Sequence, residues 1–285
     1  MKNFFIIILW VISLLFISIY TYENPELIDV SKNYFKKNFS PKVQIKKGIV
    51  QKIEANHFDI SFSKTIALSE KTAFVVHDNK NLDFDENLLK IYTQNGYLIQ
   101  NLKSKKINLP NTFTINKNGG IKSVFTYKNN SFALISSLVD NCYYSSIVLL
   151  EKSKEVFKTK CLPDNLIDYN GLGSSTIHFE DSVLISIGAP EQASKKIALL
   201  AQNEDSMYGK ILQISFSDLE KVISNESSSI NPNIYSFGHR NPQGLTKLKK
   251  SIFSVEHGPR GGDELNKITE LGYQSNHSLF YTQKP

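Results

Sequence analysis

Two Gly/Pro-rich stretches hold most of the residues that could do chemistry in this 285-residue chain. FGHRNPQG occupies residues 237–244, and EHGPRGGDE occupies residues 256–264. The chain has 33 lysines and arginines in total. Only two of them are arginines, Arg240 and Arg260, and each lies in one of these stretches. Because a guanidinium offers a carboxylate a planar fork that an ammonium lacks, this placement indicates a carboxylate-bearing ligand.

The same stretches contain groups that suit a hard cation. The backbone carbonyls of Gly258 and Pro259, with Asp263 and Glu264 close by in sequence, are oxygen donors of the kind that Ca²⁺ prefers. Loops on a rigid scaffold are common places for binding sites. The alternative is a pair of tight turns held only by arginine–carboxylate contacts. Further side chains able to form hydrogen bonds are His239, Asn241, Gln243 and His257.

The elements expected to position these loops are short β-strands. From residue 44 onward, alternating apolar and polar runs are broken by Asn, Gly, Asp or Ser, which is typical of an all-β protein. One segment, SDLEKVIS at 217–224, is predicted to be a helix, with Ser217 as its candidate N-cap.

A weak internal repeat favours a β-propeller. Residues 123–136, 174–186 and 244–255 each contain an apolar strand, a polar turn and a second apolar strand. A period of about 50 residues in an all-β sequence is typical of four-stranded blades. A β-sandwich is the alternative, although it gives no reason for this spacing.

Together, the two loops are similar to segments of the PQQ-dependent glucose/sorbosone (aldose sugar) dehydrogenase family. That family writes them G-H-R-N-P-Q-G and E-H-G-P-x-x-x-D-E-L-N, and EHGPRGGDELN here continues to Asn266. AQNEDSMYGKILQI at 201–214 is similar to a third family segment, A-Q-x-x-x-x-x-x-G-K-I-L-R-I. The resemblance covers roughly residues 170–272, and before that it is only architectural. It implies a six-bladed propeller with Ca²⁺ and PQQ on its axis, which oxidises aldose sugars.

Carried over residue by residue, the resemblance implies roles for the two loops. Arg240, Asn241 and Gln243 would contact the quinone. The carbonyls of Gly258 and Pro259 would bind Ca²⁺. In addition, His239 is the candidate catalytic residue.

The chain departs from the family where that family places its catalytic histidine, the base that removes the sugar hydroxyl proton. In YNGLGSSTIHF this position falls on Asn170, Gly171 or Leu172, and none of them titrates near neutral pH. The next histidine, His178, is interpreted as structural. A neighbouring acidic position of the family is Ala189 here.

A second departure follows DELNKITELGY, where the family supplies further blades and this chain reads QSNHSLFYTQKP. The prediction is therefore an incomplete propeller of about four to five blades. Two functions stay open. One is sugar oxidation, and the other is a non-catalytic or truncated propeller that acts as a binding or interaction module.

The N-terminal segment predicts a membrane anchor. Residues 4–20 are apolar apart from two serines, which is close to the roughly 20 residues that span a bilayer. Lys2 precedes them and no small-x-small cleavage site follows, so a signal anchor over 1–22 is preferred to a cleaved signal peptide. The predicted arrangement is this anchor, a tether over 23–43, and an extracytoplasmic propeller over 44–285 on the periplasmic side of an inner membrane.

The two cysteines fit that placement. Cys142 and Cys161 bracket two predicted strands joined around EKSK. If Leu149 pairs with Lys154, continuing the same register puts the two cysteines opposite each other. The sequence therefore predicts a disulfide formed in an oxidising compartment, with two unpaired thiols as the alternative.

The charge pattern points away from nucleic acid. The formal net charge of +6 comes from scattered lysines, without a basic stripe or interleaved aromatics. The predicted partners are a small sugar and, through the N-terminal helix, a membrane. A nucleic acid or an anionic membrane surface is the alternative explanation of the excess lysine.

Overall fold

The structure is a computed structural model of the whole chain. It describes residues 45–47, 50–54, 59–63, 66–68, 72–77, 89–101, 103–162, 169–189, 199–258 and 262–268, with side chains from residue 89 onward except at Asn170. The chain divides into two units, 1–42 and 43–285, and every described residue belongs to the second. The predicted anchor and tether therefore lie outside the described residues. Within the described ranges, no helix is both long and apolar enough to cross a membrane.

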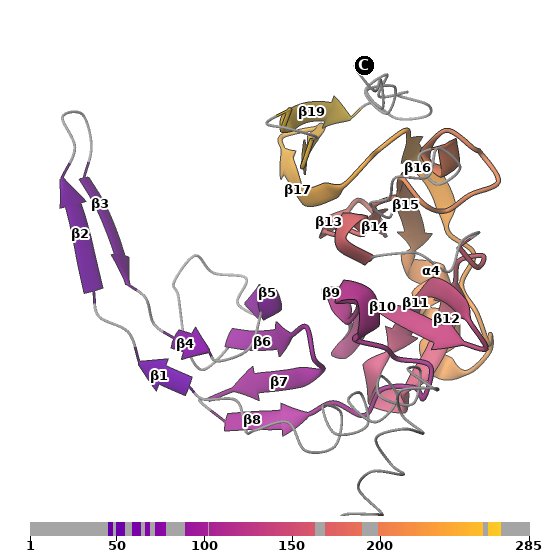
Figure 1. Ribbon diagram of the computed structural model, residues 1–285, viewed down its shortest axis with the longest axis horizontal. Helices are drawn as coiled ribbons and strands as arrows, with labels where there is room; N and C mark the ends of the chain where they lie inside the picture. The colour runs from indigo at the N-terminus through magenta and orange to yellow at the C-terminus, as the bar shows by residue number, and fades with distance from the viewer. Residues whose placement is uncertain are drawn as a thin grey trace, which may run out of the picture. The chain divides into compact units, whose positions relative to one another are not determined.

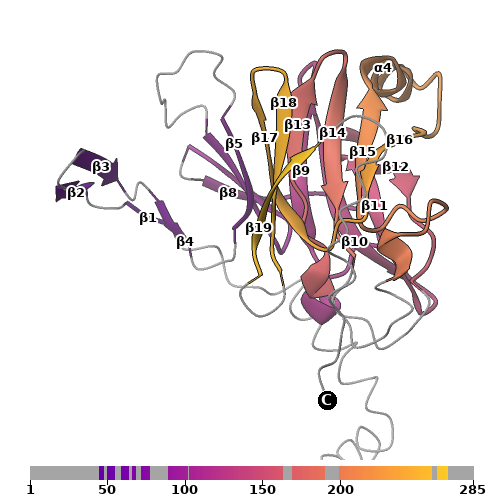
Figure 2. The ribbon, with the colours of Figure 1, turned by 90° about the horizontal axis from the view of Figure 1, so that it is seen from above.

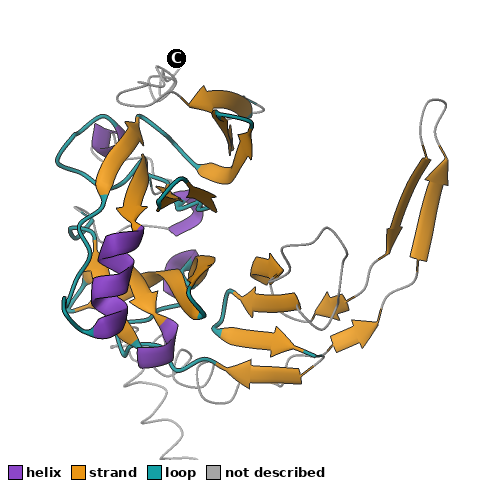
Figure 3. Cartoon of the chain, turned by 180° about the vertical axis from the view of Figure 1, so that it is seen from behind, coloured by secondary structure: helices purple, strands orange, loops and turns teal. Residues whose placement is uncertain are grey.

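Strands make up most of the regular structure in the described residues (Figure 3). The strands are β1 (Ile45–Lys47), β2 (Val50–Glu54), β3 (Asp59–Ser63), β4 (Ile66–Leu68), β5 (Thr72–His77), β6 (Leu89–Thr93), β7 (Tyr97–Gln100), β8 (Lys103–Lys106), β9 (Ile121–Tyr127), β10 (Asn130–Val139), β11 (Cys142–Leu149), β12 (Lys154–Lys158), β13 (Thr176–Phe179), β14 (Ser182–Ile187), β15 (Lys210–Ser215), β16 (Asn233–Phe237), β17 (Pro242–Leu248), β18 (Ser251–Glu256) and β19 (Glu264–Ile268). The helical elements are α4 (Phe216–Ser224) and the 3₁₀ turns η2 (Asn116–Asn118), η3 (Leu150–Lys152), η4 (Tyr169–Gly171) and η5 (Leu199–Ala201).

The strands from β5 onward form a series of antiparallel meanders (Figure 1). Strands β5–β8, β9–β12 and β13–β16 make four-stranded sheets, and β17–β19 make a three-stranded sheet. Shorter pairs are β1 with β4 and β2 with β3. The first strand of each meander lies beside the first strand of the next, so β9 contacts β5 and β13, and β13 contacts β17. This mostly-β arrangement is compatible with a β-propeller-like fold.

Tight turns fix the hairpins of these meanders (Figure 2). Lys128 and Asn129 connect β9 to β10, while Asp140 and Asn141 connect β10 to β11. All four residues have positive φ, between 45° and 63°. Two consecutive residues of positive φ give a type I′ turn, which matches the twist of paired strands, and Asn and Asp tolerate that conformation.

The core lies between successive sheets, so that the inner strands are buried on both faces. On β14, Val183 and Ile185 pack into the apolar cluster shared with β10 and β11. Leu184 between them packs with Leu245 of β17 and Ile252 of β18. Each fully buried aliphatic side chain contributes about 1.5–3 kcal/mol. Because side chains alternate between the two faces, the burial of every residue of β14 is explained by its two neighbouring sheets.

The helix differs from its prediction at its first turn. Helix α4 begins at Phe216, and its N-cap is Ser215, whose Oγ accepts a hydrogen bond from the Asp218 amide at 3.0 Å. Ser217, the predicted cap, is an exposed residue inside the first turn. The physical reason is that a capping hydroxyl must precede the helix and reach the amide three residues on, and β15 runs directly into α4.

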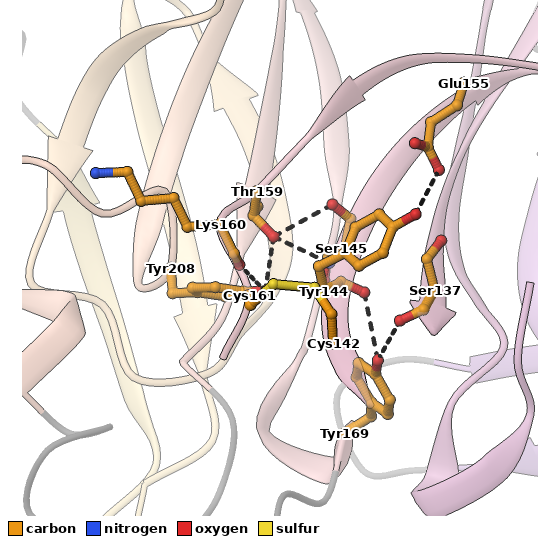
Figure 4. Close-up of a disulfide and its surroundings, with 10 residues drawn as sticks. All are labelled: Ser137, Cys142, Tyr144, Ser145, Glu155, Thr159, Lys160, Cys161, Tyr169 and Tyr208. Atoms are coloured by element: carbon orange, nitrogen blue, oxygen red, sulfur yellow. Dashed lines mark hydrogen bonds between the residues drawn. A yellow bond between two sulfur atoms is a disulfide. The ribbon is translucent and has the colours of Figure 1, made fainter. Parts of the chain in front are cut away.

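Cys142 and Cys161 are joined by a disulfide, with 5.2 Å between their Cα atoms (Figure 4). The register that leads to it is not the predicted one. Leu149 does pair with Lys154, but a β-bulge then shifts the ladder by one residue, so that Ile147 pairs with Phe157. The cysteines therefore lie beyond the paired part of β12 and are not directly opposite each other. Their Cα separation still falls within the range that a disulfide bridges.

Candidate functional site

The two Gly/Pro-rich loops lie together at one end of the third and fourth meanders. Residues 238–241 connect β16 to β17, and residues 257–263 connect β18 to β19. The His257 amide donates to the Asn241 carbonyl at 3.1 Å. Arg240 Nη1 donates to the His257 carbonyl at 2.8 Å. The loops that carry the arginine and the Gly-Pro pair are therefore bonded to each other.

A buried pair of side chains lies beneath this junction. His239 is 0% exposed and Glu256 is 3% exposed. His239 Nδ1 lies 2.5 Å from Glu256 Oε1, and His239 Nε2 lies 2.8 Å from Ser236 Oγ. Glu256 also accepts hydrogen bonds from the Arg240 amide at 3.1 Å and from Asn266 Nδ2 at 3.2 Å. Glu256, at the end of β18, is thus bonded to His239 and the Arg240 amide in the first loop and to Asn266 on β19, which follows the second loop.

The surroundings keep Glu256 ionised. Burial by itself raises the pKa of this carboxyl group. The hydrogen bond and charge of His239, with donation from the Arg240 amide and Asn266, outweigh burial and leave the pKa below its ordinary value. An ionised carboxylate under the loop makes the strong, charge-assisted class of hydrogen bond.

Ser236, His239 and Glu256 follow the order of a nucleophile, a base and an acid in a hydrolase relay. All three are almost completely buried, so no substrate reaches the serine or the histidine. A general base must come within about 3 Å of the proton that it removes. Both ring nitrogens of His239 have partners, Ser236 and Glu256, and the catalytic role predicted for this residue stays a prediction.

A third loop joins the first two. The Gly173 amide donates to Asn241 Oδ1 at 2.7 Å, and the Gly188 amide donates to the Gly173 carbonyl at 3.0 Å. The Ala189 amide donates to the Arg240 carbonyl at 2.7 Å. Hence the segment predicted to contain the family's histidine position, the segment after β14 and the arginine loop form one corner.

Two glycines permit this close approach. A Cβ at Gly173 would collide with Asn241 Oδ1, and a Cβ at Gly188 would collide with the Gly171 carbonyl. Gly188 thus lies against backbone and Gly173 against the Asn241 side chain, where a larger residue would separate the three segments.

The corner has no base at the predicted position. Leu172 is 1% exposed, Gly171 is buried, and Ala189 is 6% exposed. His178 lies on β13, is exposed, and its Nε2 is 2.9 Å from the Thr126 carbonyl. The predicted structural role of His178 agrees with this contact.

An exposed histidine–aspartate pair adjoins Arg240. His257 Nδ1 lies 3.0 Å from Asp263 Oδ1, and the two side chains are 57% and 63% exposed. The Gly258 amide donates to the same Asp263 oxygen at 2.9 Å. In the sequence these two residues are separate candidates, six positions apart. They come together because both belong to the loop that connects β18 to β19.

The predicted quinone and calcium residues differ in their surroundings. Asn241 is 4% exposed, and its Oδ1 is used by the Gly173 amide, whereas Gln243 is exposed and Arg240 is half-buried. Gly258 is buried, and Pro259 lies outside the described residues, as does Arg260. In the part of the chain that the structure describes, no group of three or more His, Cys, Asp or Glu side chains could hold a metal ion. Backbone carbonyls are a different kind of ligand, so the calcium prediction stays a prediction.

Lys210 is a residue that the sequence reasoning missed. Its side chain is completely buried, and Nζ donates to the carbonyls of Leu200 at 3.0 Å, Ala201 at 2.7 Å and Tyr208 at 3.0 Å. Burial lowers the pKa of Lys210 to about 8, although the charge of Glu204 acts in the opposite direction. The available signal was a lysine opening the apolar strand KILQIS.

A match to a protein family covers this whole region. A family model described as glucose/sorbosone dehydrogenase matches residues 124–273. The uncharacterized protein slr1608 of Synechocystis sp. is 35% identical over 99 residues. That match covers 31% of this chain and 24% of the relative, so the chain spans about a quarter of the relative's length.

Proposed function

The chain belongs to the glucose/sorbosone dehydrogenase family, and from that premise we propose that it binds PQQ and oxidises an aldose sugar at the corner of the three loops. The observation that supports this is the set of hydrogen bonds joining Gly173, Asn241, Arg240 and His257. They leave the Arg240 side chain half-buried at the junction, with its guanidinium fork held by a carbonyl.

The described residues fit a carboxylate-bearing cofactor at Arg240. The guanidinium is a planar group, the kind that pairs with a carboxylate, and it is held in place by the His257 carbonyl; the neighbouring exposed Gln243 adds an amide. Asn241 acts indirectly, because its side-chain oxygen holds the Gly173 amide. The carbonyls of Gly258 and Pro259 are the proposed Ca²⁺ ligands. When bound, PQQ would supply the acceptor for the two electrons that leave the sugar.

The proton of the sugar hydroxyl requires a base of this chain. We assign that role to His257, because Asp263 holds its Nδ1 and its carbonyl accepts from Arg240. A carboxylate on Nδ1 fixes the ring orientation and leaves Nε2 as the proton acceptor.

A non-catalytic binding module is the second candidate. The observation that favours it concerns two positions where the family has ionisable residues. Leu172 is one of the candidates for the position of the catalytic histidine, and Ala189 stands at the neighbouring acidic position; both are buried and apolar. Removing a general base typically lowers a rate by about 10²–10⁴-fold. A chain that kept the loops without an effective base would bind the cofactor and sugar without rapid turnover.

One set of measurements separates these functions. The purified chain is titrated with PQQ in millimolar Ca²⁺, and dye reduction with glucose is then compared with a no-protein control. Saturable binding with turnover of about 1–10³ per second supports the enzyme. Binding with turnover no faster than the control supports the module, and no binding contradicts both.

Variants identify the residues. Arg240→Lys keeps the charge and removes the fork, so PQQ affinity should fall about tenfold, or roughly 1.4 kcal/mol. Lys250→Arg in the exposed β17–β18 turn is the matched control and should leave affinity unchanged. If the chain turns over, His257→Gln should abolish turnover while retaining PQQ binding, whereas His178→Gln should not.

We also propose that the domain is held on the extracytoplasmic side of an inner membrane. The apolar segment 4–20 and the Cys142–Cys161 disulfide support this, since disulfides persist in oxidising compartments. In cell fractions, the full-length chain should resist carbonate extraction and be degraded by protease added to spheroplasts. Release by carbonate, or protection from protease, would contradict the placement.

A further inference from the structure

The ammonium group of Lys210 occupies a cage of backbone carbonyls. Its side chain is 0% exposed, and its three N–H groups are matched by the carbonyls of Leu200, Ala201 and Tyr208, all within 3.0 Å. A buried cation is costly unless such acceptors surround it. The segment from η5 to β15 is therefore folded around this charge.

The same segment is bonded to the arginine loop. The Ala201 carbonyl accepts from Lys210 Nζ and also from the Gly238 amide at 2.9 Å. The His239 amide donates to the Gly209 carbonyl at 3.1 Å. Gly238 and His239 directly precede Arg240, so this segment is the support on which the loop rests.

The 199–209 segment is closely packed at Gly209, against the arginine loop. Gly209 has a φ of +67°, and a Cβ there would collide with Ala201 and with the His239 carbonyl. The neighbours of Lys210 on β14 and β16 are Ile187 and Phe237, which carry no charge. The described acidic group that acts on Lys210 is Glu204, in the same segment.

We propose that Lys210 is a positioning residue for the Arg240 loop, and that its buried ammonium holds the 199–209 segment in the shape that Gly238 and His239 require. The proposal rests on the proposed function only where it names Arg240 as a ligand contact. The positioning of the loop is a separate property and has its own measurement.

Hydrogen exchange measures that property without any ligand. Lys210→Met retains the volume and removes the charge, so the amide protection of residues 238–241 should fall at least tenfold. Residues 121–136 of β9 and β10 should keep their protection in this variant. Lys152→Met is the matched control, because Lys152 also donates to a carbonyl, that of Ile223, but at an exposed helix end. It should leave 238–241 unchanged.

Chemical rescue distinguishes the charge from simple packing. Lys210→Ala leaves a gap the size of n-propylammonium, and that cation should restore protection at 238–241, whereas 1-propanol should not. Equal rescue by both compounds, or unchanged protection in Lys210→Met, would overturn the proposal. Loss of protection at 121–136 as well would also overturn it, because Lys210 would then hold the whole fold.

PQQ titration adds the link to function. The Lys210→Met chain should bind PQQ about tenfold more weakly than the wild-type chain. If the wild-type chain binds no PQQ, the proposed function fails, while the exchange and rescue results still decide the role of Lys210. If PQQ binds equally to both chains although the loop has loosened, Lys210 does not position the ligand site.

Discussion

Replacing Glu256 by glutamine removes a charge from beneath the arginine loop and changes almost no volume. Glu256 accepts from His239, from the Arg240 amide and from Asn266. The glutamine amide retains one acceptor oxygen. Its NH₂ group must then face either His239 or the Arg240 amide, and both of these present donors to the carboxylate.

The magnitude follows from those contacts. Removing one partner of a buried ion pair typically costs about 3–5 kcal/mol, and a buried amide left without an acceptor costs about 1–3 kcal/mol. Since part of the network survives in glutamine, we expect the free energy of unfolding to fall by about 3 kcal/mol. With a urea m-value of about 2 kcal/mol/M, the midpoint should fall by roughly 1.5 M.

Urea unfolding followed by the fluorescence of the buried tyrosines, such as Tyr169 and Tyr208, and by circular dichroism measures this change. Glu264→Gln is the matched control, since Glu264 is half-buried and also accepts from Asn266 at 3.2 Å. It should cost less than about 1 kcal/mol. A loss below 1 kcal/mol for Glu256→Gln would refute the reasoning that this carboxylate holds the loops together.

The pH dependence gives the same argument a second test. The pKa of Glu256 is lowered in the folded chain from an ordinary value of 4.5. The unfolded chain therefore binds more protons at acid pH, and the stabilisation from Glu256 is complete above 4.5 and lost as pH falls through the folded pKa. The gap between wild type and Glu256→Gln should stay constant from about pH 7 to 5 and narrow below 4.5. A gap that widens in acid would contradict the ionised state.

Three further predictions concern other parts of the fold. Cys142→Ser should lower the free energy of unfolding by about 3 kcal/mol in a thermal melt, and reductant should lower the wild type equally; no change would show that the disulfide constrains nothing. Gly173→Ala should lower PQQ affinity or stability by at least about 2 kcal/mol, because the added carbon meets Asn241, and combining it with Asn241→Ala should recover part of the loss. Additive losses would contradict that contact. Ser215→Ala should cost about 1 kcal/mol in urea, whereas Ser217→Ala should stay within about 0.5 kcal/mol; the reverse order would assign the cap to Ser217.

Several features could be predicted because they depend on neighbours in sequence. Alternation of apolar residues and the polar turns at 128–129 and 140–141 are local signals, and they locate the hairpins of the second meander. The corner of three loops was accessible for a related reason. Arg240 lies just before β17 and the Gly-Pro loop just after β18, and these two strands pair in one sheet. The loop around Leu172 was identified through the family motif.

Other features depend on contacts that the sequence does not display. Ser215 and Ser217 are both plausible caps, and only the point where β15 ends decides between them. The β-bulge opposite Val148 shifts the register of the β11–β12 pair, and no glycine or proline in β12 indicates it in the sequence. The burial of Lys210 depends on carbonyls of the segment that precedes β15. The local sequence shows only a lysine at the start of a strand and does not indicate that its side chain is buried.

The disulfide links the site to the way in which the chain matures. Next to Cys161, the Lys160 carbonyl accepts from the hydroxyl of Tyr208, the residue whose own carbonyl contacts Lys210 (Figure 4). On the Cys142 side, the hydroxyl of Tyr169, which directly precedes the Leu172 loop, donates to the carbonyl of Tyr144 at 3.3 Å. The two stretches of chain joined by the disulfide are thus hydrogen-bonded to two of the segments that support the corner. A chain produced where thiols remain reduced would lack the disulfide, so a ligand titration reports on the native site only when the oxidation state of that preparation has been established.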